Sequence, residues 1–180
     1  SRRADGGTHV EPYERTLDDY YAEFITEHYA NPRWLEHDAD IFRWLVKHPL
    51  AKGAGILCGE HHDQNGAGFF ELRWDVPGKA AVLFGFNREM DWRQWLALAN
   101  LATAWRAQQG VPVAKVVVFR TQEQPLIPKP TWHKAAPVIE AAKDVCLQLV
   151  VLNVETASEL YAARDLYAEA CSGSVGRYST

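Results

Sequence analysis

The chain has 180 residues, of which 47% are hydrophobic and 23% charged, and its formal net charge is −4. This length and composition are typical of a single globular domain. The acidic balance excludes a generally basic protein that coats nucleic acid, because non-specific affinity of that kind comes from lysine and arginine on phosphates. No run of about 18 apolar residues is present, so we expect no membrane-spanning helix.

The three cysteines, Cys58, Cys146 and Cys171, are odd in number and widely spaced, which does not favour a disulfide framework. The first seven residues are polar and lack the apolar core of a signal peptide. Together these features predict a soluble protein of a reducing, cytoplasmic compartment, and Cys146, in an apolar stretch, is expected to be buried.

The domain organisation is predicted from where regular patterns begin and end. Residues 1–16 are interpreted as a flexible tail or linker, residues 17–172 as a single α/β domain, and residues 173–180 as a second flexible tail. We expect the chain to be a domain of a larger protein.

The first half of the domain is expected to form two helices and three strands. Aromatic residues at helical spacing predict a helix over 17–29, and Thr16 is a suitable N-cap because its hydroxyl accepts from the first turn. The pattern then predicts a second helix over 32–47 and strands over 54–58, 69–75 and 79–86. The last of these strands is continuously apolar, as expected of a central strand buried on both faces.

The second half alternates between helix and strand. The spacing predicts helices over 91–109, 131–143 and 156–171, and strands over 115–119 and 147–154. A three-strand meander followed by this alternation predicts an α/β fold with a mixed five-stranded sheet flanked by helices. In the longest predicted helix, Trp92, Trp95 and Trp105 share a face and are expected to pack in the core.

The densest polar cluster follows the first predicted strand, and its side chains are all possible metal ligands. The candidates are Glu60, His61, His62 and Asp63, with Glu71 from the next strand. No second pair of ligands with regular zinc spacing is present. The alternative is a solvated hairpin turn around Asn65-Gly66, since Asn-Gly is a strong hairpin signal.

A possible catalytic set consists of Asp63 and the run Glu71-Leu72-Arg73. Alternation along a strand places Glu71 and Arg73 on one face. Two carboxylates meeting there would suit Mg²⁺, and the cation beside them would orient a phosphate. The alternative is that Glu71 and Arg73 form a solvent-facing ion pair.

This acidic-x-basic pattern, together with the order α-βββ-α-β over roughly residues 17–120, resembles the PD-(D/E)xK restriction-endonuclease-like superfamily. The chain departs from that pattern at three points: Arg73 replaces the lysine, no proline precedes Asp63, and the motif falls on the second strand of the meander instead of the third. The resemblance therefore implies a nuclease-like core that binds or scaffolds without cutting.

The best binding candidate is the predicted loop from Arg120 to Lys134, which contains three prolines and few acids. Basic residues interleaved with an aromatic contact phosphates and stack on bases in nucleic-acid interfaces. The candidate residues are Arg120, Lys129, Trp132, His133 and Lys134. The alternative is a crossover loop in which Trp132 packs inward as an anchor.

Three functions remain open from the sequence. The first is a nucleic-acid-associated, nuclease-like and catalytically inactive domain of a larger DNA-processing or mobile-element protein. The second is a protein-interaction module, docking on another protein of the same complex through exposed aromatics such as Trp34 or Trp132. The third is a metal-dependent hydrolase or nuclease using the cluster around His61 and Asp63. We expect either no cofactor or Mg²⁺, and no membrane partner.

Overall fold

The computed structural model describes residues 15–31, 34–50, 53, 55–86, 91–109 and 115–173, with side chains left out of the description for 34–38 and 49–50. The predicted tails therefore fall almost wholly outside the described residues. The elements in chain order are α1 (Leu17–Ala30), α2 (Trp34–Leu45), a π-helical turn η1 (Val46–Leu50), β1 (Leu57–Glu60), β2 (Leu72–Asp75), β3 (Val82–Gly85), α4 (Trp92–Gln109), β4 (Lys115–Thr121), α5 (Ala136–Val145), β5 (Leu147–Leu152) and α6 (Val154–Ser172).

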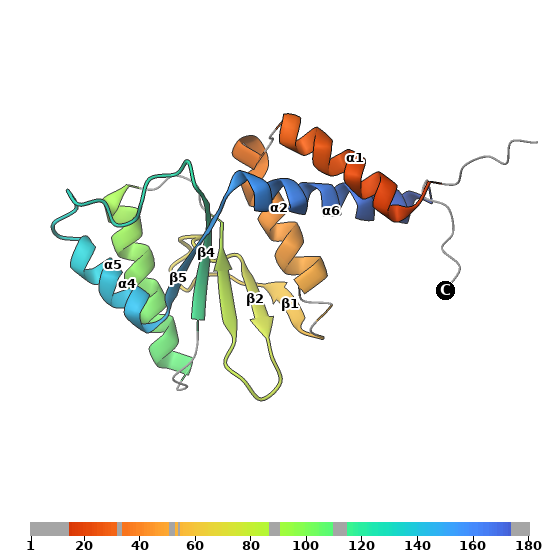
Figure 1. The fold of residues 1–180 in the computed structure, drawn as a ribbon. Coiled ribbons are helices and arrows are strands. Elements are labelled where there is room, and N and C mark those ends of the chain that lie inside the picture. The colour runs from red at the N-terminus through yellow and green to blue at the C-terminus, as the bar shows by residue number, and fades with distance from the viewer. Residues whose placement is uncertain are drawn as a thin grey trace, which may run out of the picture.

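The five strands form one mixed sheet in the order β1-β2-β3-β4-β5. β1, β2 and β3 are antiparallel neighbours, whereas β3, β4 and β5 run parallel. The parallel strands are joined through helices, as a parallel connection requires, and Figure 1 shows these helices beside the sheet. The predicted α/β class with a three-strand meander is confirmed.

The helices cover the two faces of this sheet. α4 and α5 lie together on one face, and α2 lies with α6 on the other, where α1 packs along α6 (Figure 1). Each face has its own apolar core. The core beneath α4 and α5 is built around the fully buried Trp95, Leu83 and Val116, and the core beneath α2 and α6 around Phe42, Phe84 and Tyr161.

Local signals explain several elements. The hydroxyl of Thr16 accepts from the backbone N–H of Asp19, whose carboxylate accepts from the backbone N–H of Thr16, so both ends of a capping box are present. Asp91 accepts from the N–H groups of Arg93 and Gln94 and so begins α4. The predicted core positions Trp95, Trp105 and Cys146 are buried, while Trp92 is half-buried.

The first two strands are shorter and start later than the apolar pattern predicts. The antiparallel ladder ends where Glu60 pairs with Leu72, and residues 61–71 form a long loop instead of a tight Asn-Gly hairpin. The physical reason lies in Asp63, whose buried carboxylate accepts the backbone N–H groups of Phe69 and Phe70. Because those N–H groups donate to a side chain, they do not pair with β1, and the ladder between β1 and β2 begins only after them.

Gly85 allows this loop to lie close to the sheet. A Cβ atom at Gly85 would lie 2.5 Å from the carbonyl oxygen of Phe69, so any larger residue would displace the loop. The glycine in the otherwise apolar third strand thus marks a close backbone approach.

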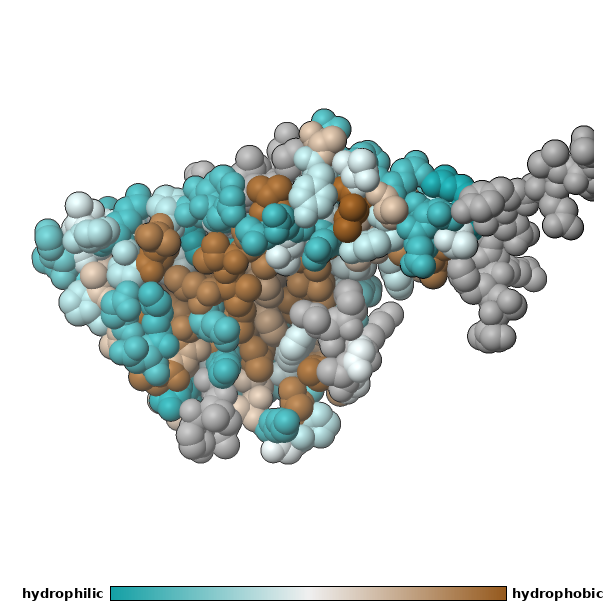
Figure 2. All heavy atoms as spheres, viewed as in Figure 1, coloured by the Kyte–Doolittle hydropathy of each residue, from teal (hydrophilic) through white to brown (hydrophobic). Residues whose placement is uncertain are grey.

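None of the helices in the described part of the chain is both long and apolar enough to cross a bilayer. In Figure 2 the hydrophobic residues on this face gather in one area over the sheet, with polar residues mainly around it.

Candidate functional site

Two loops hold the residues that the sequence singles out. We call residues 61–71, between β1 and β2, the acidic loop, and residues 122–135, between β4 and α5, the basic loop. Each loop is held by one buried charged side chain: Asp63 lies within the acidic loop, and Arg120 lies in β4 beneath the basic loop.

Asp63 organises the acidic loop from inside. It is only 7% exposed, and its Oδ2 accepts hydrogen bonds from the backbone nitrogens of Phe69 at 2.6 Å and Phe70 at 3.3 Å. The backbone carbonyl of Asp63 also accepts from the N–H of Gly66 at 2.9 Å. Within the described residues, the second carboxylate oxygen, Oδ1, has no hydrogen-bond partner.

His61 is the ion-pair partner of Asp63, and its Nε2 lies 3.5 Å from Oδ1. Burial lowers the pKa of His61 below its ordinary value of 6.5, and the nearby carboxylate of Asp63 opposes this effect only in part. The neighbouring candidates Glu60 and His62 are exposed to solvent.

Two hollows lie on either side of this histidine–aspartate pair. One has a volume of about 360 Å³ and is bounded by the basic residues Arg43 and Lys47, and the other, of about 250 Å³, is bounded by residues of α4. His61, His62 and Asp63 line both hollows. The acidic loop thus forms a wall shared by the two hollows.

Glu71 does not join Asp63 or Arg73. Its two carboxylate oxygens accept from Nε and Nη2 of Arg43 at 2.7 and 3.0 Å, which is a bidentate ion pair between α2 and the acidic loop. Hydrogen bonding to Glu71 is the main reason that the pKa of Arg43 is raised. Arg73 instead pairs with Asp75 at 2.8 Å, so the solvent-facing pair of Glu71 with Arg73 is not formed.

The predicted metal ligands are only partly brought together. Over the residues that the structure describes, no three histidine, cysteine or carboxylate side chains converge on one point. β3, the neighbour of β2, contributes only Val82, Leu83, Phe84 and Gly85, and the ring of Phe86 lies 5.4 Å from the guanidinium carbon of Arg43. The carboxylate of Glu71 is therefore taken up by Arg43, and both side chains line the hollow of about 360 Å³.

In the basic loop, the structure corrects the position of Arg120. β4 extends to Thr121, so Arg120 is a strand residue, and it is only 3% exposed. Its Nη2 donates to the carbonyl oxygen of Pro125 at 3.0 Å, and its guanidinium lies 5.3 Å from the centre of the Trp95 ring. Arg120 supports the loop from beneath and is not part of an exposed phosphate-binding surface.

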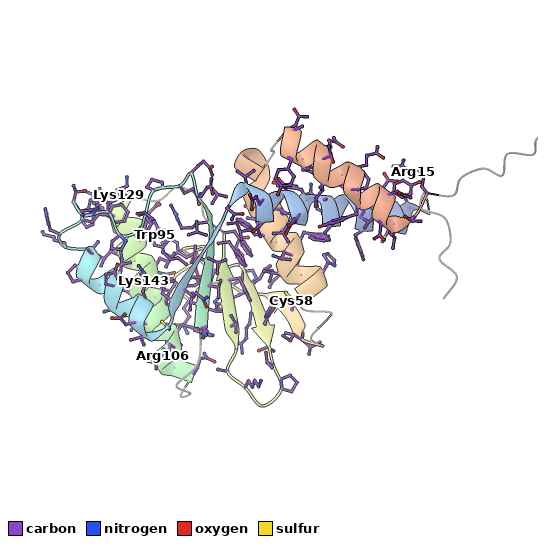
Figure 3. All side chains as sticks on the ribbon, in the orientation of Figure 1. Arg15, Cys58, Trp95, Arg106, Lys129 and Lys143 are labelled. Carbon is purple, nitrogen blue, oxygen red and sulfur yellow. The ribbon has the colours of Figure 1, made fainter. Side chains whose placement is uncertain are left out.

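The other four candidates of the basic loop are at the surface. Lys129, His133 and Lys134 are exposed, whereas Trp132 is half-buried against the core, as the alternative interpretation predicts in part. Nζ of Lys129 lies 5.8 Å from the centre of the Trp132 ring. Figure 3 shows Lys129 at the end of the molecule where this loop covers α4 and α5.

A hollow of about 240 Å³ joins the basic loop to the start of α4. Its lining consists of Trp92, Thr131, Trp132, His133, Lys134 and Ala135. No carboxylate belongs to this lining, as far as the described residues show. Arg93 adds a further cation, with its guanidinium carbon 5.0 Å from the centre of the Trp92 ring.

Sequence reasoning missed Arg43, Trp92 and Arg93 as site residues. Trp92 was assigned to the core by its helical spacing, and only its place in the first turn of α4 indicates that it reaches the surface. Arg43 carried no signal, since its partner Glu71 lies on another element. Trp44 is half-buried beside Tyr167, with ring centres 6.1 Å apart, and the side chain of Trp34 lies outside the described set.

Comparisons with protein-family models, with curated proteins and with solved structures find no match to this chain.

Proposed function

We propose that this domain binds nucleic acid through the hollow between the basic loop and the start of α4, and that it does so without cleaving it. The observation that carries the proposal is the lining of that hollow, in which Trp92 and Trp132 occur with His133 and Lys134 and, among the described residues, without a carboxylate.

Each part of this lining matches a part of a nucleotide. Aromatic rings stack on bases, at about 1–3 kcal/mol per base, whatever the base is. Lysine and arginine side chains attract phosphates, and Lys129 and Arg93 lie beside the two tryptophan rings. The net charge of −4 means that this attraction is local, so binding is expected to be weak and confined to one surface.

The absence of cleavage is inferred from the acidic loop and its neighbouring strand. The PD-(D/E)xK resemblance requires two carboxylates and a lysine on adjacent strands. In this chain Glu71 is held by Arg43, and the four residues of β3 are uncharged. These contacts support binding without cleavage, and we propose that the nuclease-like core serves in recognition within a larger DNA-processing or mobile-element protein.

The proposal is tested by fluorescence anisotropy with a labelled oligonucleotide at low salt, titrated with the whole chain. A Lys129→Glu, Lys134→Glu double variant should bind at least about tenfold more weakly, and the slope of log K against log salt should fall by about one for each lysine lost.

The matched control is Lys79→Glu, Lys115→Glu, which makes the same change in net charge at two exposed lysines outside the basic loop. Equal losses in the two double variants would mean that only overall charge matters and would remove the assignment to this hollow. No detectable binding at low salt would refute the proposed function itself.

A further inference from the structure

The two edges of the sheet are built differently. The edge strand β1 has only four residues and includes Gly59 and Glu60, and a short strand with a charge is a poor template for pairing. The other edge strand, β5, has six residues, of which five are apolar and one is glutamine. In the shared view of Figures 1 and 2, β5 lies in front of β4 and hydrophobic residues gather over this part of the sheet. A long, uncharged edge of this kind is a surface on which another strand can add.

The ladder with β4 shows which backbone groups of β5 are in use. The N–H groups of Val116 and Gln122 donate to the carbonyl oxygens of Cys146 and Leu152, at 2.9 and 3.0 Å. In a parallel pair, every second residue of a strand turns its N–H and C=O groups towards the same neighbour. The even-numbered residues of β5 therefore face β4 with their backbone groups.

The residues between them, Leu147, Leu149 and Val151, turn their N–H and C=O groups away from the sheet. Among the described residues, no other strand lies on that side. The same strand of a second copy offers the same free groups. If the two strands run antiparallel about a two-fold axis at Leu149, Leu149 faces its own copy and Leu147 faces Val151, and each of these pairs exchanges both of its hydrogen bonds.

Neighbouring registers leave some of these groups without partners. A shift of two residues would pair Leu147 with Asn153, whose carbonyl oxygen already accepts a backbone N–H of α6. The opposite shift would pair Val151 with Val145, which belongs to α5. The axis at Leu149 is therefore the register that uses all the free backbone groups of β5.

The side chains of β5 fit the same arrangement. Leu147 and Leu149 pack against the core beneath α4 and α5, and alternation places Val151 on that same face, where it is 53% exposed. In the antiparallel pair, Val151 lies opposite Leu147 of the second copy. A hollow of about 460 Å³ opens there, lined in part by Val145, Leu147 and Leu149. The exposed valine at one end of β5 thus meets an apolar wall at the other end.

We propose that β5 is the contact between two copies of this chain, whose β5 strands pair antiparallel about a two-fold axis at Leu149 and join the two sheets into one. Each copy has a net charge of −4, so two copies repel at long range, and the uncharged β5 brings no like charges opposite each other. Six residues extend over about 20 Å. Strand pairing alone therefore buries less than about 1,200 Å² and gives a weak, concentration-dependent dimer.

Sedimentation equilibrium of the whole chain, in reducing buffer and from micromolar to millimolar concentration, measures the association. We expect a monomer–dimer equilibrium that Val151→Lys weakens by at least about tenfold, because lysine on an edge strand blocks further pairing. Since Val151 is exposed, the single chain should tolerate the change, and circular dichroism checks its fold. Leu57→Lys is the matched control, because it makes the same kind of change at an exposed apolar residue of the other edge strand. It should leave the equilibrium unchanged.

Amide hydrogen exchange tests the register. Exchange at Leu147, Leu149 and Val151 should slow as the concentration rises, whereas the even-numbered residues of β5, bonded to β4 in both states, should show no such dependence. A chain that stays monomeric at millimolar concentration overturns the proposal and leaves a strand of another protein as the occupant of this edge. Equal weakening by Val151→Lys and Leu57→Lys, or a concentration dependence confined to other residues, overturns it as well. The contact shares no residue with the lining of the hollow at the basic loop, so it is independent of nucleic-acid binding there.

Discussion

The acidic loop and the basic loop are each held by a buried charged side chain, but the two charges have opposite signs. Within the acidic loop a buried anion, Asp63, accepts backbone N–H groups, whereas the basic loop is supported from β4 by a buried cation, Arg120, which donates to a backbone carbonyl of the loop. Both are long connections that leave the sheet, and each needs an internal charged group to satisfy its backbone.

The difference lies in what remains after the loop is satisfied. The guanidinium of Arg120 donates to the carbonyl of Pro125 and lies over the ring of Trp95. The exposed cations of the basic loop are therefore other residues. One oxygen of Asp63 accepts from the backbone, and the other is buried 3.5 Å from Nε2 of His61. A charged residue in a loop is therefore informative about function only after its structural contacts have been accounted for.

The largest expected loss of stability comes from a substitution at Asp63. We expect Asp63→Ala to lower the free energy of unfolding by about 2–4 kcal/mol, because it leaves the N–H groups of Phe69 and Phe70 without their acceptor. Urea unfolding measures the change. The control Asp75→Ala removes an exposed carboxylate paired with Arg73 and should change stability by under about 1 kcal/mol. A similar small change at Asp63 would show that the loop does not depend on this carboxylate.

Arg120 should give the next largest effect. Arg120→Ala is expected to lower the free energy of unfolding by about 2–3 kcal/mol, since it removes a buried hydrogen bond from a charged group and the contact with Trp95. The exposed Arg93→Ala should stay within about 0.5 kcal/mol in the same measurement. If the two variants were equally stable, the buried position of Arg120 would be refuted.

A substitution at Gly85 tests the acidic loop alone, because Gly85 contacts that loop and not the basic loop. Gly85→Ala should destabilise the chain by about 1–3 kcal/mol, since the added methyl group would lie against the carbonyl of Phe69. It should leave oligonucleotide binding by the basic loop unchanged. Gly59→Ala, in β1, is the matched control, because its Cβ would meet nothing within 4 Å. Equal effects at the two glycines would contradict the close approach of the acidic loop.

The smallest expected effect is a pH dependence at His61. Burial holds the pKa of His61 in the folded state below its ordinary value of 6.5, so the unfolded chain binds the proton more readily. Stability should therefore fall as the pH drops below about 6.5, and it should fall more in the parent than in His61→Gln. Urea unfolding at pH 7.5 and 5.5 compares the parent with His61→Gln. Identical pH profiles would show that protonation of His61 does not destabilise the fold.

Much of the fold was predictable because its signals are local. The capping box of Thr16 and Asp19, the Asp91 cap and the apolar third strand each depend on neighbours within a few residues. The order of strands and helices then follows from connection rules, since adjacent antiparallel strands need only turns and parallel ones need crossovers. The α/β class and the five-stranded sheet follow from such signals.

The assignment of roles within the candidate sites was not predictable in the same way. Glu71 is paired by Arg43 from α2, Arg120 is covered when β4 enters the core, and Trp92 meets Trp132 only where α4 starts beside the basic loop. The sequence by itself determined which residue types are present and which elements they form, because periodicity and capping act over short separations. Only the tertiary structure decided which charges are paired, buried or free, because ion pairing and burial depend on contacts between elements far apart in the chain.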